Sequence, residues 1–136
     1  MDFNQFLQDF VNKDYDELVY IAKKSIADLH PACAAVDKDN DGFFMITSIS
    51  LSAIGADGTL TEKERALLRD ALNVSDEVIS KYIKLYDSKM VDLVDSFADS
   101  LSTDIKSSVM MLVLSIMCSD EKISKEETAL IRKLMA

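Results

Sequence analysis

The sequence is poor in residues that break helices and in residues that build catalytic or covalent sites. Among its 136 residues are three glycines, one proline, two cysteines, one histidine and no tryptophan. So few glycines and prolines cannot supply the many turns of an all-β fold, which favours helices. Two isolated cysteines, Cys33 and Cys118, offer neither a disulfide framework nor a thiolate metal site. One histidine, His30, is too few for a histidine-based metal centre.

Long apolar runs and excess positive charge are also missing. The longest apolar stretch, Val109 to Cys118, is about half as long as a membrane-spanning helix needs, so we expect a buried core helix there and no membrane span. The formal net charge is −9 and the isoelectric point is near 4.5. This charge repels nucleic acid and permits cations or basic protein surfaces as partners, or else serves only solubility. The first residues lack a basic segment followed by an apolar one, so we expect no signal peptide and a cytoplasmic protein.

Apolar residues at helical spacing predict one all-helical domain over residues 1–136, with roughly seven to eight helices and no sheet. The clearest stripe consists of Leu18, Ile21, Ala22, Ile26 and Leu29. His30-Pro31 is expected to interrupt this helix, and a short apolar helix over residues 32–36 is expected to follow. Ser75 or Asp76 can begin another helix. Further helices are predicted over residues 43–56, 61–72, 89–101 and 103–118.

An internal repeat relates residues 49–72 to residues 112–135 at one constant offset of 63 positions (120 minus 57), without a gap. The aligned polar pairs are Asp57 with Asp120, Thr61 with Ser124, and Glu64 with Glu127. In each copy, over about residues 43–72 and 106–136, an apolar helix leads through a short acidic loop to a capping box and an amphipathic helix. Two such copies packed about a pseudo-two-fold axis would form one core.

The segment from Ala53 to Glu64 closely resembles the A-x-A-D-G-x-[IL]-[ST]-x-x-E element of the TerB-like, tellurite-resistance-associated family. Residues 119–127 resemble its second copy, but Ser119 and Glu121 replace the alanine and glycine of the pattern. The resemblance extends from about residue 43 to the end. It implies an all-helical pseudo-symmetric fold, a cytoplasmic or membrane-peripheral setting, a link to stress responses and no generally established catalytic activity.

The four repeated acids, Asp57, Glu64, Asp120 and Glu127, are the main candidate site. A two-fold fold could bring them onto one surface, where carboxylate oxygens suit Ca²⁺, Mg²⁺ or Mn²⁺. The family resemblance also implies metal binding through acids of this kind. The alternative is structural, because Glu64 and Glu127 can close capping boxes and the Asp-Gly pair at Asp57 can form an ordinary turn.

A second acidic group, Asp37-x-Asp39-x-Asp41-Gly42, matches the first half of an EF-hand calcium loop. The second half of the loop does not match, because Ser48 stands where the bidentate glutamate is needed. A weak calcium site and a solvated turn are both open at this stage.

Common enzyme motifs are missing from the sequence, which contains no G-x-S-x-G, P-loop or Rossmann glycine pattern. We therefore expect a non-enzymatic TerB-like module that binds a protein partner, or senses a divalent cation, in a stress-related system of the tellurite-resistance kind. The alternative is a metal-dependent hydrolase or phosphoryl-transfer enzyme that uses the four repeated acids. An enzyme needs those acids to converge in a pocket, whereas a module leaves them apart as helix caps.

Overall fold

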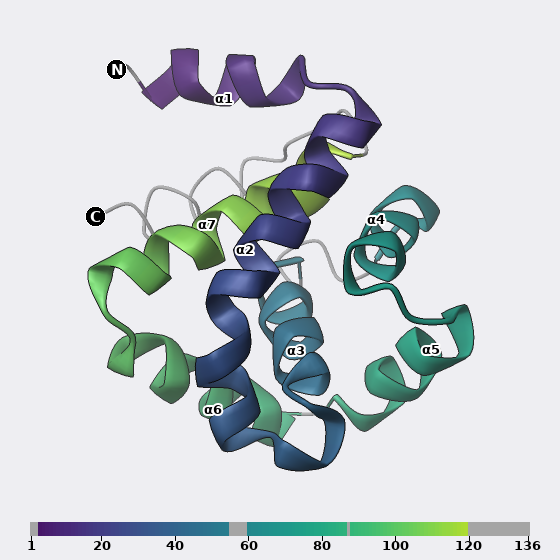
Figure 1. Cartoon of the computed structure of the whole chain (residues 1–136), viewed down its shortest axis with the longest axis vertical. Helices are drawn as coiled ribbons and strands as arrows, with labels where there is room; N and C mark the ends of the chain where they lie inside the picture. Colours follow the sequence, from purple (N-terminus) through teal and green to yellow (C-terminus); the bar gives the residue numbers. More distant parts are fainter. Residues whose placement is uncertain (1–2, 55–59, 87, 120–136) are drawn as a thin grey trace.

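A computed structural model gives the fold and describes residues 3–54, 60–86 and 88–119 (Figure 1). These residues form seven α-helices and one short 3-10 helix, with no strand among them, and the all-helical prediction is confirmed. The helices are α1 (Phe3–Val11), α2 (Tyr15–Val36), η1 (Lys38–Asn40), α3 (Phe43–Ile54), α4 (Glu62–Leu72), α5 (Asp76–Leu85), α6 (Ser88–Ser100) and α7 (Thr103–Cys118).

Side-chain caps fix where several of these helices begin. Asp14 caps α2, Thr61 caps α4, Ser75 caps α5 and Ser102 caps α7, each by accepting a hydrogen bond from a backbone N–H of the first turn. The first N–H groups of a helix have no intrahelical partner, so these oxygens satisfy donors that would otherwise need water. Of the two starts that the sequence left open for α5, Ser75 is the cap.

The long helix α2 is the centre of the domain. It contacts α7, α4 and α3, and Figure 1 shows it crossing α7 with α3 beside it. One buried stripe runs along its whole length at three- and four-residue spacing and consists of Leu18, Ala22, Ile26, Leu29 and Cys33. Because the stripe stays on one face, α2 reaches three helices with a single apolar surface.

The prediction that His30-Pro31 ends this helix is wrong, because α2 continues through Pro31 to Val36. A proline in a helix interior removes the hydrogen bond to the carbonyl four residues earlier and costs about 3 kcal/mol. Leu29 and Cys33, one on each side of the proline, are both fully buried. Their burial offsets the cost, since a break at Pro31 would take Cys33 off the buried face. Pro31 itself is exposed.

The apolar helices α3 and α7, which head the two predicted repeat copies, are both core helices. Residues 45–50 of α3 and residues 112–118 of α7 are buried throughout. Thr47, Ser50 and Ser115 donate their hydroxyl groups to the carbonyl four residues earlier, whereas the buried Ser48 hydroxyl has no hydrogen-bond partner among the described residues. In the described part of the chain, no helix combines the length and the apolar character that crossing a membrane requires.

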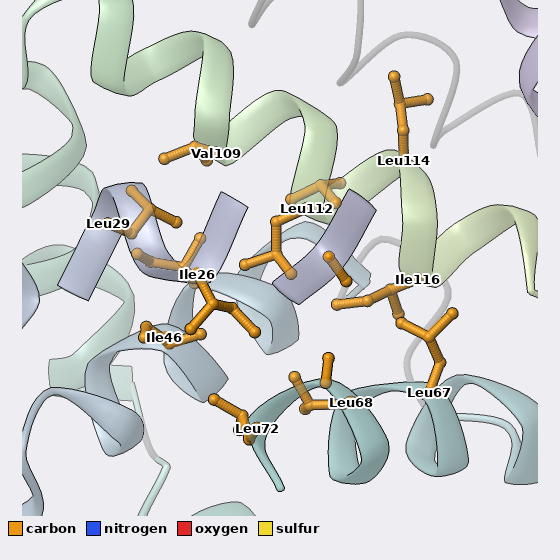
Figure 2. Close-up of a cluster of buried hydrophobic side chains, with 14 of the residues drawn as sticks. Ile26, Leu29, Ile46, Leu67, Leu68, Leu72, Val109, Leu112, Leu114 and Ile116 are labelled. Atoms are coloured by element: carbon orange, nitrogen blue, oxygen red, sulfur yellow. The ribbon is translucent and has the colours of Figure 1, made fainter. Parts of the chain in front are cut away.

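The main core lies between α2, α3, α4 and α7. Figure 2 shows Ile26 of α2, Ile46 of α3 and Leu112 and Ile116 of α7 facing Leu68 of α4. All but Ile26 are completely buried, and Ile26 is 8% exposed. Burying one such side chain stabilises a fold by about 1.5–3 kcal/mol. Helices α5 and α6 also contact α3.

Replacing Pro31 with alanine is expected to stabilise the protein, because alanine restores the missing N–H at an exposed position. We expect the free energy of unfolding to rise by about 1–2 kcal/mol, less than the full proline penalty since proline also restricts the unfolded chain. Urea unfolding followed by circular dichroism measures the change. Pro31→Gly is the matched control and should gain about 1 kcal/mol less than Pro31→Ala. A loss of stability in Pro31→Ala would contradict the description of α2 as one helix under local strain.

Candidate functional site

Glu64 is the member of the four-acid group that the structure describes, while Asp57, Asp120 and Glu127 lie outside the described residues. Its Oε1 accepts the N–H of Thr61 at 2.8 Å, and its own N–H donates to Thr61 Oγ1 at 3.2 Å. This reciprocal pair is the predicted capping box of α4, which is confirmed. The convergence of all four acids stays a prediction.

The Glu64 side chain is also buried, with only 4% of its surface exposed. A buried carboxylate requires compensation, to which the Thr61 N–H and the positive end of the α4 dipole contribute. The next turn of α4 carries Leu67 and Leu68, both fully buried, so the start of this helix belongs to the core. A cation that used Glu64 as a ligand would share its carboxylate with the helix cap.

Asp37 lies where α2 ends and the acidic loop begins. Its Oδ2 accepts the N–H of Met45 at 3.1 Å, and its Oδ1 accepts a hydrogen bond from Asn40 Nδ2 at 3.3 Å. Met45 is the third residue of α3, so its N–H is one of the donors that the helix itself cannot satisfy. Asp37 therefore caps α3 from outside that helix.

The end of the same loop folds back onto α2. Asp41 has a left-handed backbone with φ of 52°, and its Oδ1 lies 3.1 Å from Nε2 of His30. Gly42 follows with φ of 81°, and a Cβ there would lie 2.8 Å from the backbone nitrogen of Ala34 and 3.0 Å from Cβ of Cys33. Glycine is thus needed at position 42 for its positive φ and for close packing against α2. The contact between His30 and Asp41 joins the end of the loop to α2.

The three loop carboxylates are not brought together as ligands. Asp37 is used at the start of α3, Asp41 lies beside His30, and Asp39 is exposed. Across the described residues, no group of three or more His, Cys, Asp or Glu side chains is placed to hold a metal ion. The loop is a turn in which Asp37 caps α3, a role that the sequence did not indicate, and calcium binding here stays a prediction.

Cys33, which packs against Gly42 of the loop, is also unsuited to metal binding or nucleophilic chemistry. It is completely buried. Burial raises the pKa of its thiol to about 12, and the negative charge of Asp37 adds to the shift. The thiolate is the nucleophilic and metal-binding form, so Cys33 stays protonated and acts as an apolar core residue.

A clamp between α4 and α5 was not visible in the sequence. Arg65 Nε lies 2.7 Å from Asp76 Oδ1, its Nη2 lies 3.1 Å from Asp76 Oδ2, and it also donates to Ser80. This hydrogen bonding lowers the pKa of Asp76. Arg69 approaches the same carboxylate at 3.4 Å. Because these side chains come from different helices, the helical pair spacing that signals an ion pair in sequence does not apply.

Two shallow surface grooves lie beside other features, one next to the Asp76 carboxylate and one next to the Asp14 cap. One has a volume of about 540 Å³ on the outer face of α5 and is lined by Asp76, Glu77, Ser80, Lys81, Lys84 and Leu85. The other has a volume of about 480 Å³ where α1 meets α2 and is lined by Lys13, Asp14, Asp16, Glu17, Tyr20 and Ile21. Neither groove is lined by Glu64 or by the acids of the loop after α2.

These features define an all-helical domain in which the buried Glu64 and the half-buried Asp37 cap helices. A family model described as Tellurite resistance protein TerB matches residues 43–136, which is more than two thirds of the chain. The chain belongs to the TerB family, as the resemblance of residues 53–64 predicted. The match starts at α3, so α1 and α2 precede the matched region. Comparisons with curated proteins and with solved structures give no match.

Glu64→Gln separates capping from metal ligation. Glutamine also closes a capping box, so we expect a change in unfolding free energy within about 0.5 kcal/mol. A cation at a hundred times its dissociation constant would add about 2.7 kcal/mol to a protein that binds it only when folded. Thermal unfolding of chelator-treated protein with and without Ca²⁺, Mg²⁺ or Mn²⁺ measures both effects, with Glu62→Gln as control. A cation-dependent stabilisation that disappears in Glu64→Gln but not in Glu62→Gln would show that Glu64 is a ligand.

Asp37→Ala and Asp39→Ala form a matched pair for the loop. Losing the cap of α3 should lower the free energy of unfolding by about 1–2 kcal/mol in Asp37→Ala. Asp39→Ala should stay within about 0.5 kcal/mol, because its side chain is exposed. Chemical unfolding in chelator measures both variants. Equal losses in the two variants, appearing only when Ca²⁺ is present, would identify a calcium loop instead of a capped turn.

Proposed function

We propose that this chain is a non-enzymatic TerB module that acts by binding a protein partner in a cytoplasmic, stress-related system of the tellurite-resistance kind. The observation that carries the proposal is that two acids which could serve a metal site are engaged as helix caps. Glu64 and Asp37 each hold the start of a helix through hydrogen bonds to backbone N–H groups. Family membership supports the association with tellurite resistance.

The surface supports protein binding as the way in which the module acts. Tyr20 is 67% exposed and Leu93 is 55% exposed, and both lie on helices whose opposite faces are packed in the core. Exposed aromatic and apolar side chains are the anchors that protein interfaces bury. The net charge of −9 would favour encounter with a basic partner.

Cation sensing and metal-dependent catalysis are the other hypotheses from the sequence. Both would use Asp57, Glu64, Asp120 and Glu127, and catalysis would further require an open coordination position beside a base. The engagement of Glu64 with Thr61 favours the module over the enzyme, because a cap holds the carboxylate in a fixed structural role. The Glu64→Gln experiment above tests cation sensing directly.

The native mass of the protein in its own cells tests partner binding. The chain alone has a mass of 15.2 kDa. We expect a tagged copy expressed at its natural level to elute from size exclusion of a gentle lysate at a clearly larger mass than the same protein after purification. Growth with tellurite should increase the high-mass fraction. Elution at the purified-protein mass, with and without tellurite, would contradict the proposal.

A further inference from the structure

Helix α3 carries the one buried side-chain oxygen that is left without a hydrogen bond among the described residues. This atom is Oγ of Ser48, and the whole residue is buried. The nearby hydroxyls of Thr47 and Ser50 are buried too, but each donates to the carbonyl four residues earlier. A buried hydroxyl without a partner gives up its hydration for nothing in return, so the folded state carries a free-energy penalty at Ser48.

Ser48 lies in the interface between α3 and α5. Residues four positions apart share one face of a helix, so Ser48 shares a face with Phe44 before it and Ser52 after it. The rings of Phe44 and Tyr82 are in contact, with 5.7 Å between their centroids, and the hydroxyls of Ser52 and Tyr86 share a hydrogen bond of 2.8 Å. Tyr82 belongs to α5 and Tyr86 directly follows it. The two residues that flank Ser48 on this face therefore both contact α5.

Helix α5 is held in place by few buried side chains. Only Ile79 and Tyr82 of this helix are buried, whereas α7 is buried continuously over residues 112–118. Its main contacts are with α3, and at its exposed start Asp76 joins it to Arg65 of α4. Figure 1 shows α5 at the edge of the molecule. A helix of 10 residues is marginal in water without tertiary packing, so α5 loses its helical structure when it leaves α3.

The penalty at Ser48 and the small buried face of α5 favour the same opening. When α5 leaves α3, water reaches the Ser48 hydroxyl, and this hydration lowers the free energy of opening. The contacts that join α2, α4 and α7 to one another do not involve α5 and stay in place. Segments with few buried apolar contacts open at a lower free energy than the core. The interface between α3 and α5 therefore opens before the core does.

We infer that α5 is a lid over one face of α3, which opens by local unfolding while α2, α3, α4 and α7 stay folded, and that the unpaired Ser48 hydroxyl sets how often it opens. The open state uncovers Ser48 and the part of the Phe44 ring that Tyr82 covers. This inference is independent of the proposed function, because it concerns an equilibrium of the chain alone.

Native-state hydrogen exchange of the full chain measures the opening, under conditions where exchange reports the opening equilibrium. The informative amides are those of Tyr82 and Ile83 in α5, compared with Leu112 in α7. We expect the two α5 amides to be at least about tenfold less protected than Leu112 and less sensitive to denaturant, because a local opening exposes less surface. Equal protection and equal denaturant dependence at all three amides would overturn the inference, since α5 would then open only together with the core.

Ser48→Ala and Ser50→Ala form a matched pair that tests the role of the hydroxyl. Both variants remove a buried hydroxyl and raise helix propensity, but Ser50 is already paired and lies two positions further on, on the other side of α3. Ser48→Ala should slow exchange at Tyr82 and Ile83 by about tenfold, because opening no longer hydrates a hydroxyl there. Ser50→Ala should change it by less than about twofold, since the surroundings of Ser50 are the same in the open state.

Three results with these variants contradict the inference. If Ser48→Ala slows exchange at Leu112 but not at Tyr82 and Ile83, Ser48 stays buried when α5 opens, and α5 is not its lid. If Ser48→Ala slows none of the three amides, the hydroxyl carries no penalty and does not set the opening. If Ser50→Ala slows the α5 amides as much as Ser48→Ala does, the effect comes from a more stable α3 and not from the interface with α5.

Discussion

The apolar stripe of α2 is the constraint on which the rest of the domain depends. Over 22 residues it presents one face to α7, α4 and α3, and α7 in turn contacts α3 and α4. The stripe keeps its register through Pro31 because residues on both sides of the proline are fully buried. Tertiary packing thus overrides a local preference worth about 3 kcal/mol.

Helix ends explain the use of the acidic residues. A bundle of short helices exposes many backbone N–H groups at its helix starts, and each start needs an acceptor. Asp14, Thr61, Ser75 and Ser102 supply acceptors from the preceding residue, while Asp37 and Glu64 supply them across a turn. Carboxylates engaged in this way stabilise the scaffold.

Much of this arrangement could be predicted from the sequence, because helical periodicity and caps are local signals. The buried helix α7 and the capping box at Thr61 follow from residue type and spacing, whereas the start of α5 was left open between Ser75 and Asp76. The continuation of α2 through Pro31 could not be predicted, since it depends on burial against helices distant in sequence. The contact from Asp37 to Met45 was likewise hidden, because the spacing of the loop acids indicated a calcium loop or a solvated turn and not a helix cap. The remaining members of the four-acid group lie outside the described residues, so their geometry stays a prediction.

Native-state hydrogen exchange tests most directly the claim that α2 is one continuous helix holding a single core. The informative amides are those of Leu29 and Cys33, on either side of the proline, compared with Leu112 of α7. The account predicts that all three exchange only through global unfolding, with the same opening free energy and the same dependence on denaturant. Exchange at Cys33 through a separate opening of much lower free energy would contradict it, because the last turns of α2 would then be a unit that folds independently of the core.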